Sequence, residues 1–228
     1  NHFVGCMWPL SSLYNKCYDP EKQGGNGRAV RPYYPLEIDG KVEKVPVILQ
    51  GPRQRSKWGY SHSIEYNSHS IELDLGDDVP LFHQTMQRLD ERVKRVCLEN
   101  KNLWFTNSKT MDEKVMNFIY APMVKVNEKN GTRYTDSMRL KIKEYSRKGK
   151  SYFNAKAFDS SSTQATPKAI ELTEIAQGDY VKCLFHFAKI WIAQKIYTPL
   201  ELIQVKKLEA SVAPIIKGYA LVEDGEDQ

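Results

Sequence analysis

Hydrophobic and polar residues alternate along much of the chain that follows Pro122. Within the strand predicted at 138–145, the residues MRLKIK place apolar side chains on one face and basic side chains on the other. A second strand is predicted at 123–128, and Asn130-Gly131 between the two is a strong signal for a tight hairpin turn. Further strands are expected, at 151–159, 169–173, 180–193 and 199–208. The pattern therefore predicts a sheet with one apolar and one cationic face.

The first half of the chain carries shorter β signals. Residues 41–50 alternate and are rich in β-branched side chains, which predicts a strand whose proline lies at an edge or a bulge. The basic, aromatic stretch 51–60 is expected to be a loop, followed by short strands at 64–66 and 70–75. Prolines and glycines interrupt residues 1–40, which we expect to form an irregular arm with short strands at most.

Between these halves the apolar residues recur at intervals of three and four. This spacing predicts an amphipathic helix from Leu81 to Glu99, with Asp77-Asp78 at its N-terminus, where negative charge favours the helix dipole. A second helix is expected to begin at Thr110 or Asp112 and end at Ile119, and Trp104-Phe105 is expected to fill the core between the two helices. The outer face of the first helix is predicted to be charged and to carry Arg88, Asp90, Glu91, Arg92, Lys94 and Arg95.

Five or six strands with long basic loops and inserted helices fit a Greek-key barrel of the oligonucleotide/oligosaccharide-binding (OB) type. The expected fold class is therefore α+β, mainly β. We expect an irregular arm at 1–40, an OB-like nucleic-acid-binding domain at 41–210 with a helical insertion at 78–120, and an acidic tail at 211–228.

Charge is concentrated in one region of this layout. The chain has 228 residues and a net charge of +5, and 41% of its residues are hydrophobic, which is enough for a core and excludes wholesale disorder. Residues 125–156 alone hold ten Lys and Arg against three acidic residues. Because this excess exceeds that of the whole chain, the remainder is close to neutral, and a polyanion would meet this region first.

Aromatic side chains lie among these cations, as they do in the stretch 51–60. Lysines and arginines can follow a phosphate backbone while aromatic rings stack on bases, a combination typical of single-strand binding with little sequence preference. The alternative is a solvated face that only aids solubility. The candidate binding residues are Arg53, Arg55, Lys57, Trp58, Tyr60, Lys125, Arg139, Lys141, Lys143, Tyr145, Arg147, Lys148, Lys150, Tyr152 and Phe153. They do not distinguish DNA from RNA.

Other kinds of site find little support. The four cysteines form no C-x-x-C pair, so we expect reduced, mostly buried thiols in a cytosolic or nuclear protein that is not secreted, and no zinc site. The chain has no phosphate loop, nucleophile elbow or H-E-x-x-H motif, and its histidines lack helical metal-ligand spacing. We therefore expect no enzyme activity, no catalytic residue, no metal and no cofactor. The sequence also has no apolar run long enough to cross a membrane.

The order of elements carries a resemblance to a known family. An amphipathic helix (LFHQTMQRLDERVKRV), a Trp-Phe segment, a second helix ending in IYAPMVK, a lysine-alternating strand and a basic hairpin follow one another. A last pair of strands, VKCLFHFAKIWIAQK and LELIQVKKLEAS, completes the order. This pattern resembles the OB-fold single-stranded-DNA-binding proteins of large nucleocytoplasmic DNA viruses and some phages, over roughly residues 80–210. Lys125, Lys141 and Lys143 match that family's strand lysines, and Ile190-Trp191-Ile192 its aromatic penultimate strand.

The resemblance implies a protein that coats exposed single strands during replication, recombination or repair, in the host cytoplasm or nucleus. It also implies an acidic C-terminal tail that binds replication proteins. A viral structural or assembly protein is the alternative. In that case the β-domain would serve as an interaction module, and regular contacts through the N-terminal arm would build a homo-oligomer.

Overall fold

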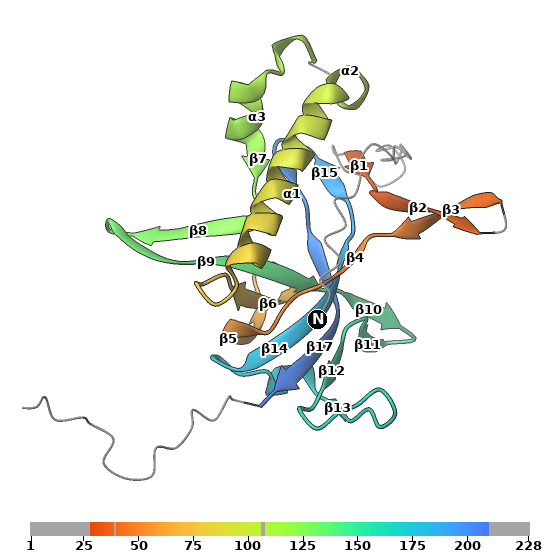
Figure 1. Ribbon diagram of the computed structural model, residues 1–228, viewed down its shortest axis with the longest axis vertical. Coiled ribbons are helices and arrows are strands. Elements are labelled where there is room, and N and C mark those ends of the chain that lie inside the picture. Colours follow the sequence, from red (N-terminus) through yellow and green to blue (C-terminus); the bar gives the residue numbers. More distant parts are fainter. Residues whose placement is uncertain (1–27, 39, 106–107, 210–228) are drawn as a thin grey trace, which may run out of the picture.

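The computed structural model describes residues 28–38, 40–105 and 108–209 (Figure 1). The expectations for residues 1–27 of the arm and for the acidic tail at 211–228 lie outside the described residues. The strands are β1 Arg28–Val30, β2 Tyr33–Ile38, β3 Lys41–Pro46, β4 Ile48–Gln50, β5 Gln54–Ser63, β6 Ser68–Asp74, β7 Tyr120–Ala121, β8 Val124–Lys129, β9 Thr132–Ile142, β10 Glu144–Arg147, β11 Lys150–Phe153, β12 Lys156–Phe158, β13 Ala169–Ile170, β14 Tyr180–Phe187, β15 Ile190–Ile192, β16 Ile196–Tyr197 and β17 Leu200–Leu208. The helices are α1 Pro80–Glu99, α2 Lys101–Trp104, η3 Ser108–Thr110, α3 Glu113–Ile119 and η4 Leu172–Glu174.

Five strands close into a barrel in the order β5-β6-β9-β17-β14, with β14 returning to β5. All neighbours are antiparallel except β9 and β17, which run parallel where Leu200 pairs with Leu140. Counted along the chain, the ring order is first, second, third, fifth, fourth, so two strands that are distant in sequence become neighbours, as in a Greek-key OB barrel. The predicted fold class is confirmed.

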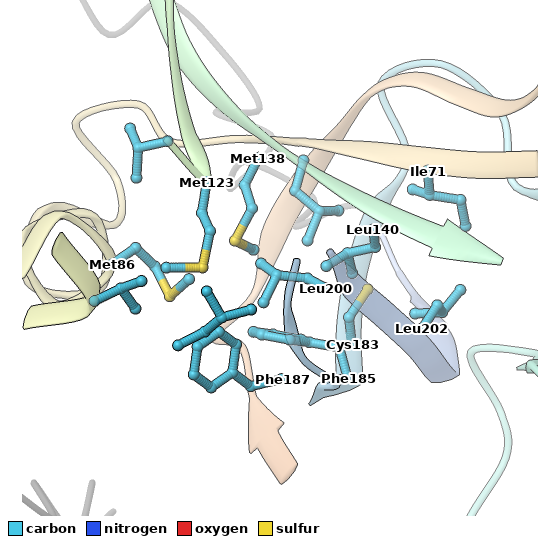
Figure 2. Close-up of a cluster of buried hydrophobic side chains, with 14 of the residues drawn as sticks. Ile71, Met86, Met123, Met138, Leu140, Cys183, Phe185, Phe187, Leu200 and Leu202 are labelled. Carbon is cyan, nitrogen blue, oxygen red and sulfur yellow. The ribbon is translucent and has the colours of Figure 1, made fainter. Parts of the chain in front are cut away.

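The barrel interior is filled by alternate residues of its strands. In the MRLKIK stretch of β9, Met138, Leu140 and Ile142 are buried while the basic residues between them face outward, as predicted. Figure 2 shows Leu140 beside Leu200 inside the barrel, with Cys183 and Phe185 of β14 close by.

Helix α1 packs against one end of the barrel, as its three-four spacing predicts. Its Met86 lies beside Met123 and Met138 (Figure 2), and its Phe82 ring meets the Phe185 ring edge-on with centroids 6.5 Å apart. Asp77-Asp78 directly precede the N-cap residue Val79, and no side chain caps the helix; their effect on the helix dipole stays a prediction.

Asp90 is the main departure from the predicted helix. It was expected on the charged outer face but is only 4% exposed. Its carboxylate accepts hydrogen bonds from the Tyr120 hydroxyl (2.6 Å) and from the backbone N–H groups of Met123 (2.9 Å) and Val124 (3.2 Å). Burial raises the pKa of Asp90, although these hydrogen bonds lower it in part. The buried carboxylate thus fastens the start of β8 to α1.

The stretch 51–60 is not the predicted loop, since most of it belongs to β5. The pairing of β5 with β6 shifts between Ser56 and Tyr60, which marks a β-bulge. The residues of this bulge made the segment resemble a loop in the sequence. Gly59 has φ +74°, and a Cβ there would lie 2.6 Å from the carbonyl oxygen of Ile175. Without a side chain at Gly59, the segment around η4 can pack directly against the bulge. The Tyr60 N–H group donates a hydrogen bond to that same Ile175 carbonyl. The predicted strand at 64–66 is the turn that joins β5 to β6.

Other predicted boundaries differ as well. The strand expected at 151–159 is divided into β11 and β12, and the strand expected at 169–173 ends at Ile170. The strand expected at 180–193 ends at Phe187, and β15 leaves the barrel to join a second sheet in the order β1-β15-β16-β7. Residues 28–38, expected in the arm, supply β1 to that sheet and pair β2 with β3. The β2–β3 hairpin projects away from the barrel (Figure 1), so it spans the expected boundary at residue 40. No helix in the described ranges is long and apolar enough to span a membrane.

Substituting Asp90→Ala should lower the free energy of unfolding by about 3–5 kcal/mol, because three donors would be left without a buried acceptor. Urea denaturation followed by tryptophan fluorescence measures this change. Asp77→Ala removes an exposed carboxylate that caps nothing and should change stability by less than about 0.5 kcal/mol. Equal effects of the two substitutions would contradict the anchoring role of Asp90.

Candidate nucleic-acid interface

One row of outward-facing side chains crosses the barrel wall. Strand pairing aligns His186 of β14 with Glu201 of β17, Glu201 with Lys141 of β9, Lys141 with Ser70 of β6, and Ser70 with Ser61 of β5. Paired residues share a face of a sheet, so these five side chains lie on the outside of the barrel while their neighbours along β6, β9 and β14 fill its core. The row lies near the barrel end from which the β5–β6 turn, the β14–β17 connection and the β10–β11 hairpin all extend.

Basic groups surround Glu201 in this row. Lys143 Nζ lies 2.7 Å from Glu201 Oε2, and Lys141 pairs with Glu201 along the backbone. Burial lowers the pKa of Lys189, the charges of Lys143, Arg31 and Lys141 lower it further, and the nearby Glu201 raises it in part. A carboxylate with this many cations around it leaves a local excess of positive charge on the surface.

Two aromatic side chains of the β14–β17 connection lie beside these cations. Lys189 Nζ is 4.7 Å from the centre of the Trp191 ring, and Lys141 Nζ is 5.6 Å from that of the Tyr197 ring. Both distances are within the range of a cation–π interaction. The wall therefore places flat rings and ammonium groups side by side, as the sequence predicted for a different set of aromatic residues.

A second basic cluster on the wall is neutralised by acidic partners. Arg139 Nη2 lies 3.3 Å from Glu72 Oε2, and the Ser137 hydroxyl donates to Glu72 Oε1 at 2.6 Å. Burial raises the pKa of Glu72, but the Ser137 hydrogen bond and the charges of Lys125 and Arg139 outweigh it and hold the pKa below its ordinary value. Glu72 thus stays ionised and offsets much of the positive charge of this part of the wall.

The β10–β11 hairpin presents a cationic, aromatic face. Its turn residues Lys148 and Gly149 both have positive φ (52° and 73°), as a tight hairpin turn requires. Pairing puts Tyr145 opposite Tyr152 on one face of the hairpin. Arg147 and its partner Lys150 lie on the same face, two residues nearer the tip. The two tyrosines are 52% and 53% exposed, so their rings are accessible to solvent. An open hollow is lined by Tyr145, Arg147, Lys148, Lys150 and Tyr152.

The other face of the hairpin contacts the barrel through His69. Glu144 Oε2 lies 3.5 Å from His69 Nε2, and the Phe153 ring meets the His69 ring edge-on with centroids 4.8 Å apart. His69 also stacks on His62 at 4.1 Å, and its Nδ1 is 2.6 Å from the Tyr60 hydroxyl. These contacts hold the hairpin so that its tyrosine face points away from the barrel.

The structure divides the predicted binding residues into separate groups. Seven lie together at one barrel end: Lys141, Lys143, Tyr145, Arg147, Lys148, Lys150 and Tyr152. Tyr60 and Phe153 belong to the anchoring contacts around His69. Lys57, Lys125 and Arg139 lie on the wall near acidic partners. Arg53 and Arg55 lie at the opposite end of β5, with their guanidinium groups 3.6 and 6.0 Å from the Tyr180 ring centre. Trp58 is 58% exposed beside the β5 bulge.

Several residues of this barrel end were not selected from the sequence. They are Arg31, Tyr66, His186, Lys189, Tyr197 and Glu201. Lys189 and Trp191 alternate in the sequence AKIWI, so a period-two reading could have placed them on one face. Tyr66 is 73% exposed in the β5–β6 turn, and no local signal distinguished it.

The described residues carry neither a metal-binding cluster nor an ionised thiol. Among the described residues, no group of three or more His, Cys, Asp and Glu side chains could hold a metal ion. Cys97 and Cys183 are buried and free, and burial raises the pKa of each thiol to about 12. Both therefore stay protonated at neutral pH, as expected of structural thiols.

The hairpin anchor predicts a measurable pKa. A hydrogen bond from Ser151 lowers the pKa of Glu144, and the neighbouring His69 and His62 lower it further against the effect of desolvation. Substituting Ser151→Ala should therefore raise the pKa of Glu144 toward its ordinary value, as measured by ¹³C NMR of the glutamate carboxyl carbons. Ser146→Ala on the facing strand is the matched control and should leave that pKa unchanged. An unaltered Glu144 pKa in Ser151→Ala would contradict the hydrogen bond.

Comparison with known proteins gives matches at the level of structure. Neither a protein-family model nor a curated protein matches the chain. Gp2.5, a single-stranded DNA binding protein encoded by bacteriophage T7, is 11% identical, with a TM-score of 0.42 over 76% of this chain and 98% of that chain. The single-stranded DNA-binding protein from bacteriophage Enc34 is 14% identical, with a TM-score of 0.43 over 78% of this chain and 90% of that chain. Its C-terminal truncation is 11% identical, with a TM-score of 0.44 and coverage of 78% and 95%.

Proposed function

We propose that this chain binds single-stranded DNA with little sequence preference and coats exposed strands during replication, recombination or repair, without catalysing a reaction. The observation that carries this proposal is the convergence of basic and aromatic side chains at one end of an OB barrel. The outer face of β6 and β9, the β5–β6 turn and the β14–β17 connection are the parts with which OB barrels bind oligonucleotides. Here the β10–β11 hairpin extends that surface.

Each part of the surface has a physical role in this proposal. Lys141 on β9 and Lys143 directly after it, with Arg147 and Lys150 at the hairpin tip, would contact successive phosphates and release counterions. Tyr145 and Tyr152 would stack on bases, an interaction that contributes about 1–3 kcal/mol per base. Every base has a flat face that can stack on a tyrosine ring, and lysine ammonium groups contact phosphates, which are the same in every sequence. We therefore expect weak sequence preference.

The accessible tyrosines favour a single strand over a duplex. Tyr145 and Tyr152 are half-exposed on a narrow two-stranded hairpin, where their rings can meet bases that are not already stacked in a helix. In a duplex the base faces are covered by neighbouring pairs, and only phosphates would remain for contact. Duplex DNA should therefore keep the charge-dependent part of the affinity and lose the stacking part.

Two finer proposals rest on the sequence and concern segments largely outside the described residues. The acidic tail at 211–228 would bind replication proteins, and the N-terminal arm at 1–40 would make homo-oligomeric contacts. Single-stranded RNA is a second ligand that the same side chains would accept. The protein would act in the host cytoplasm or nucleus.

Fluorescence polarisation with labelled oligo-dT, duplex DNA and single-stranded RNA across a salt series tests the main proposal. Oligo-dT should bind more tightly than the duplex, and its affinity should fall as salt rises, by about 0.7 in log K per unit log salt for each phosphate contact. The RNA arm decides whether the surface distinguishes the two kinds of strand. Absence of oligo-dT binding at roughly 20 mM salt, where phosphate contacts are strongest, would refute the proposal.

Substitutions separate the phosphate contacts from the stacking contacts. Replacing both Lys141 and Lys143 by Ala should reduce the salt slope by about 1.4, since two phosphate contacts are lost. Tyr152→Ala should weaken oligo-dT binding by about 1–3 kcal/mol with little change in slope. Replacing Arg53 and Arg55 by Ala removes the same positive charge at the opposite end of β5 and should change neither quantity. A larger effect of the arginine pair would place the interface at that end instead.

A further inference from the structure

Lys143 holds an acidic partner at the place where the proposed strand would lie. Its side chain is 44% exposed, whereas that of Glu201, 2.7 Å away, is 8% exposed. The carboxylate therefore lies beneath an ammonium group that faces solvent. In the free protein Glu201 is the anionic partner of Lys143. A phosphate of a bound strand could take over this role from the solvent side.

His186 is the second neighbour of Glu201. The two residues are directly paired between β14 and β17, and both point out of the barrel. Burial lowers the pKa of His186, Glu201 raises it, and the charges of Lys143 and Arg31 lower it again. The net direction is downward from 6.5, so the imidazole is largely neutral at neutral pH in the free protein.

We propose that Glu201 is an internal substitute for a backbone phosphate, released by an exchange of ion pairs when a strand binds. Lys143 leaves Glu201 for a phosphate of the nucleic acid, and His186 takes up a proton and becomes the new partner of Glu201. The proton comes from solvent and resides on the imidazole ring, and no covalent bond is made or broken. This inference rests on the proposed function, because it concerns the same surface.

The charges around the site require the two events to occur together. If Lys143 left without replacement, Glu201 would lose the ammonium group 2.7 Å away and remain nearly buried beside a neutral imidazole, and removing the close partner of a buried carboxylate is costly. Protonated His186 compensates for that loss. The groups that face His186 are Glu201 from β17, Lys143 from the junction of β9 and β10, and Arg31 from the segment after β1. Because a bound phosphate offsets the positive charge of the last two, it favours the protonated ring.

The exchange fixes the sign of a pH effect. The pKa of His186 is higher in the complex than in the free protein, so binding takes up protons at pH values between the two. The affinity for a strand therefore rises as the pH falls through this window. It would tighten at most tenfold per pH unit, the limit for one proton.

Binding of oligo-dT to the full chain at constant salt, from about pH 8 to about pH 6, tests the exchange. Wild-type protein should bind about three- to tenfold more tightly at the lower pH. Calorimetry in two buffers of different ionisation enthalpy should count net proton uptake. His186→Gln should abolish both effects, whereas the matched control His83→Gln, on α1 beside Asp136, should retain them.

Glu201→Gln provides an independent readout. Removing the carboxylate frees Lys143 before binding, so this variant should bind oligo-dT about three- to tenfold more tightly than wild type, with a weaker pH dependence. Glu128→Gln makes the same change in net charge at an exposed position of β8 and should change affinity less than about twofold.

The outcomes separate this inference from the proposed function. Wild-type pH dependence in His186→Gln, or unchanged affinity in a folded Glu201→Gln, would overturn the exchange while leaving strand binding in place. The histidine comparison decides the matter if the glutamate variant does not fold. Absence of oligo-dT binding by the wild type at every pH would refute the proposed function itself.

Discussion

The parallel pairing of β9 with β17 is the contact on which the rest of the molecule depends. It joins strands that are far apart in the chain and closes the barrel. Every other neighbouring pair in the ring is antiparallel. The two residue pairs of this contact lie on opposite faces of the barrel wall. Leu200 meets Leu140 in the core, and Glu201 meets Lys141 on the surface. Packing and surface charge are therefore set by one register, and a shift of one residue would move the acidic partner into the core and the leucine into solvent.

The features that the sequence predicted well are those determined by neighbouring residues. The alternation in Met138–Lys143 identified both faces of β9, and the three-four spacing located α1 to within one residue of its start. Asn130-Gly131 adopts the positive φ values of the expected turn. The hairpin of cations and tyrosines could be located for the same reason, because the spacing along two adjoining strands is visible without knowledge of the fold; the binding role of these residues stays a prediction.

The features that were missed depend on residues distant in the chain. Asp90 has the position of a surface charge in its helix, and only the donors of Tyr120, Met123 and Val124 make its burial favourable. Stretch 51–60 reads as a loop because its bulge is completed by the segment around Ile175. Glu201 lies in an ordinary amphipathic strand, and no residue near it in the sequence indicates that Lys143 is its partner. Tertiary pairing, rather than local propensity, decided each of these.

The β10–β11 hairpin carries two different surfaces on strands of four residues each, one for the barrel and one for solvent. Side chains alternate between these surfaces, so the parity of the strand decides which residues meet solvent. The positive φ at Lys148 and Gly149 sets that parity. Inserting or deleting a single residue in one arm would reverse the facing of side chains in that arm alone, so that its tyrosine would no longer lie on the same face as the tyrosine opposite. A change in length at this tip is therefore tolerated only where it preserves the alternation.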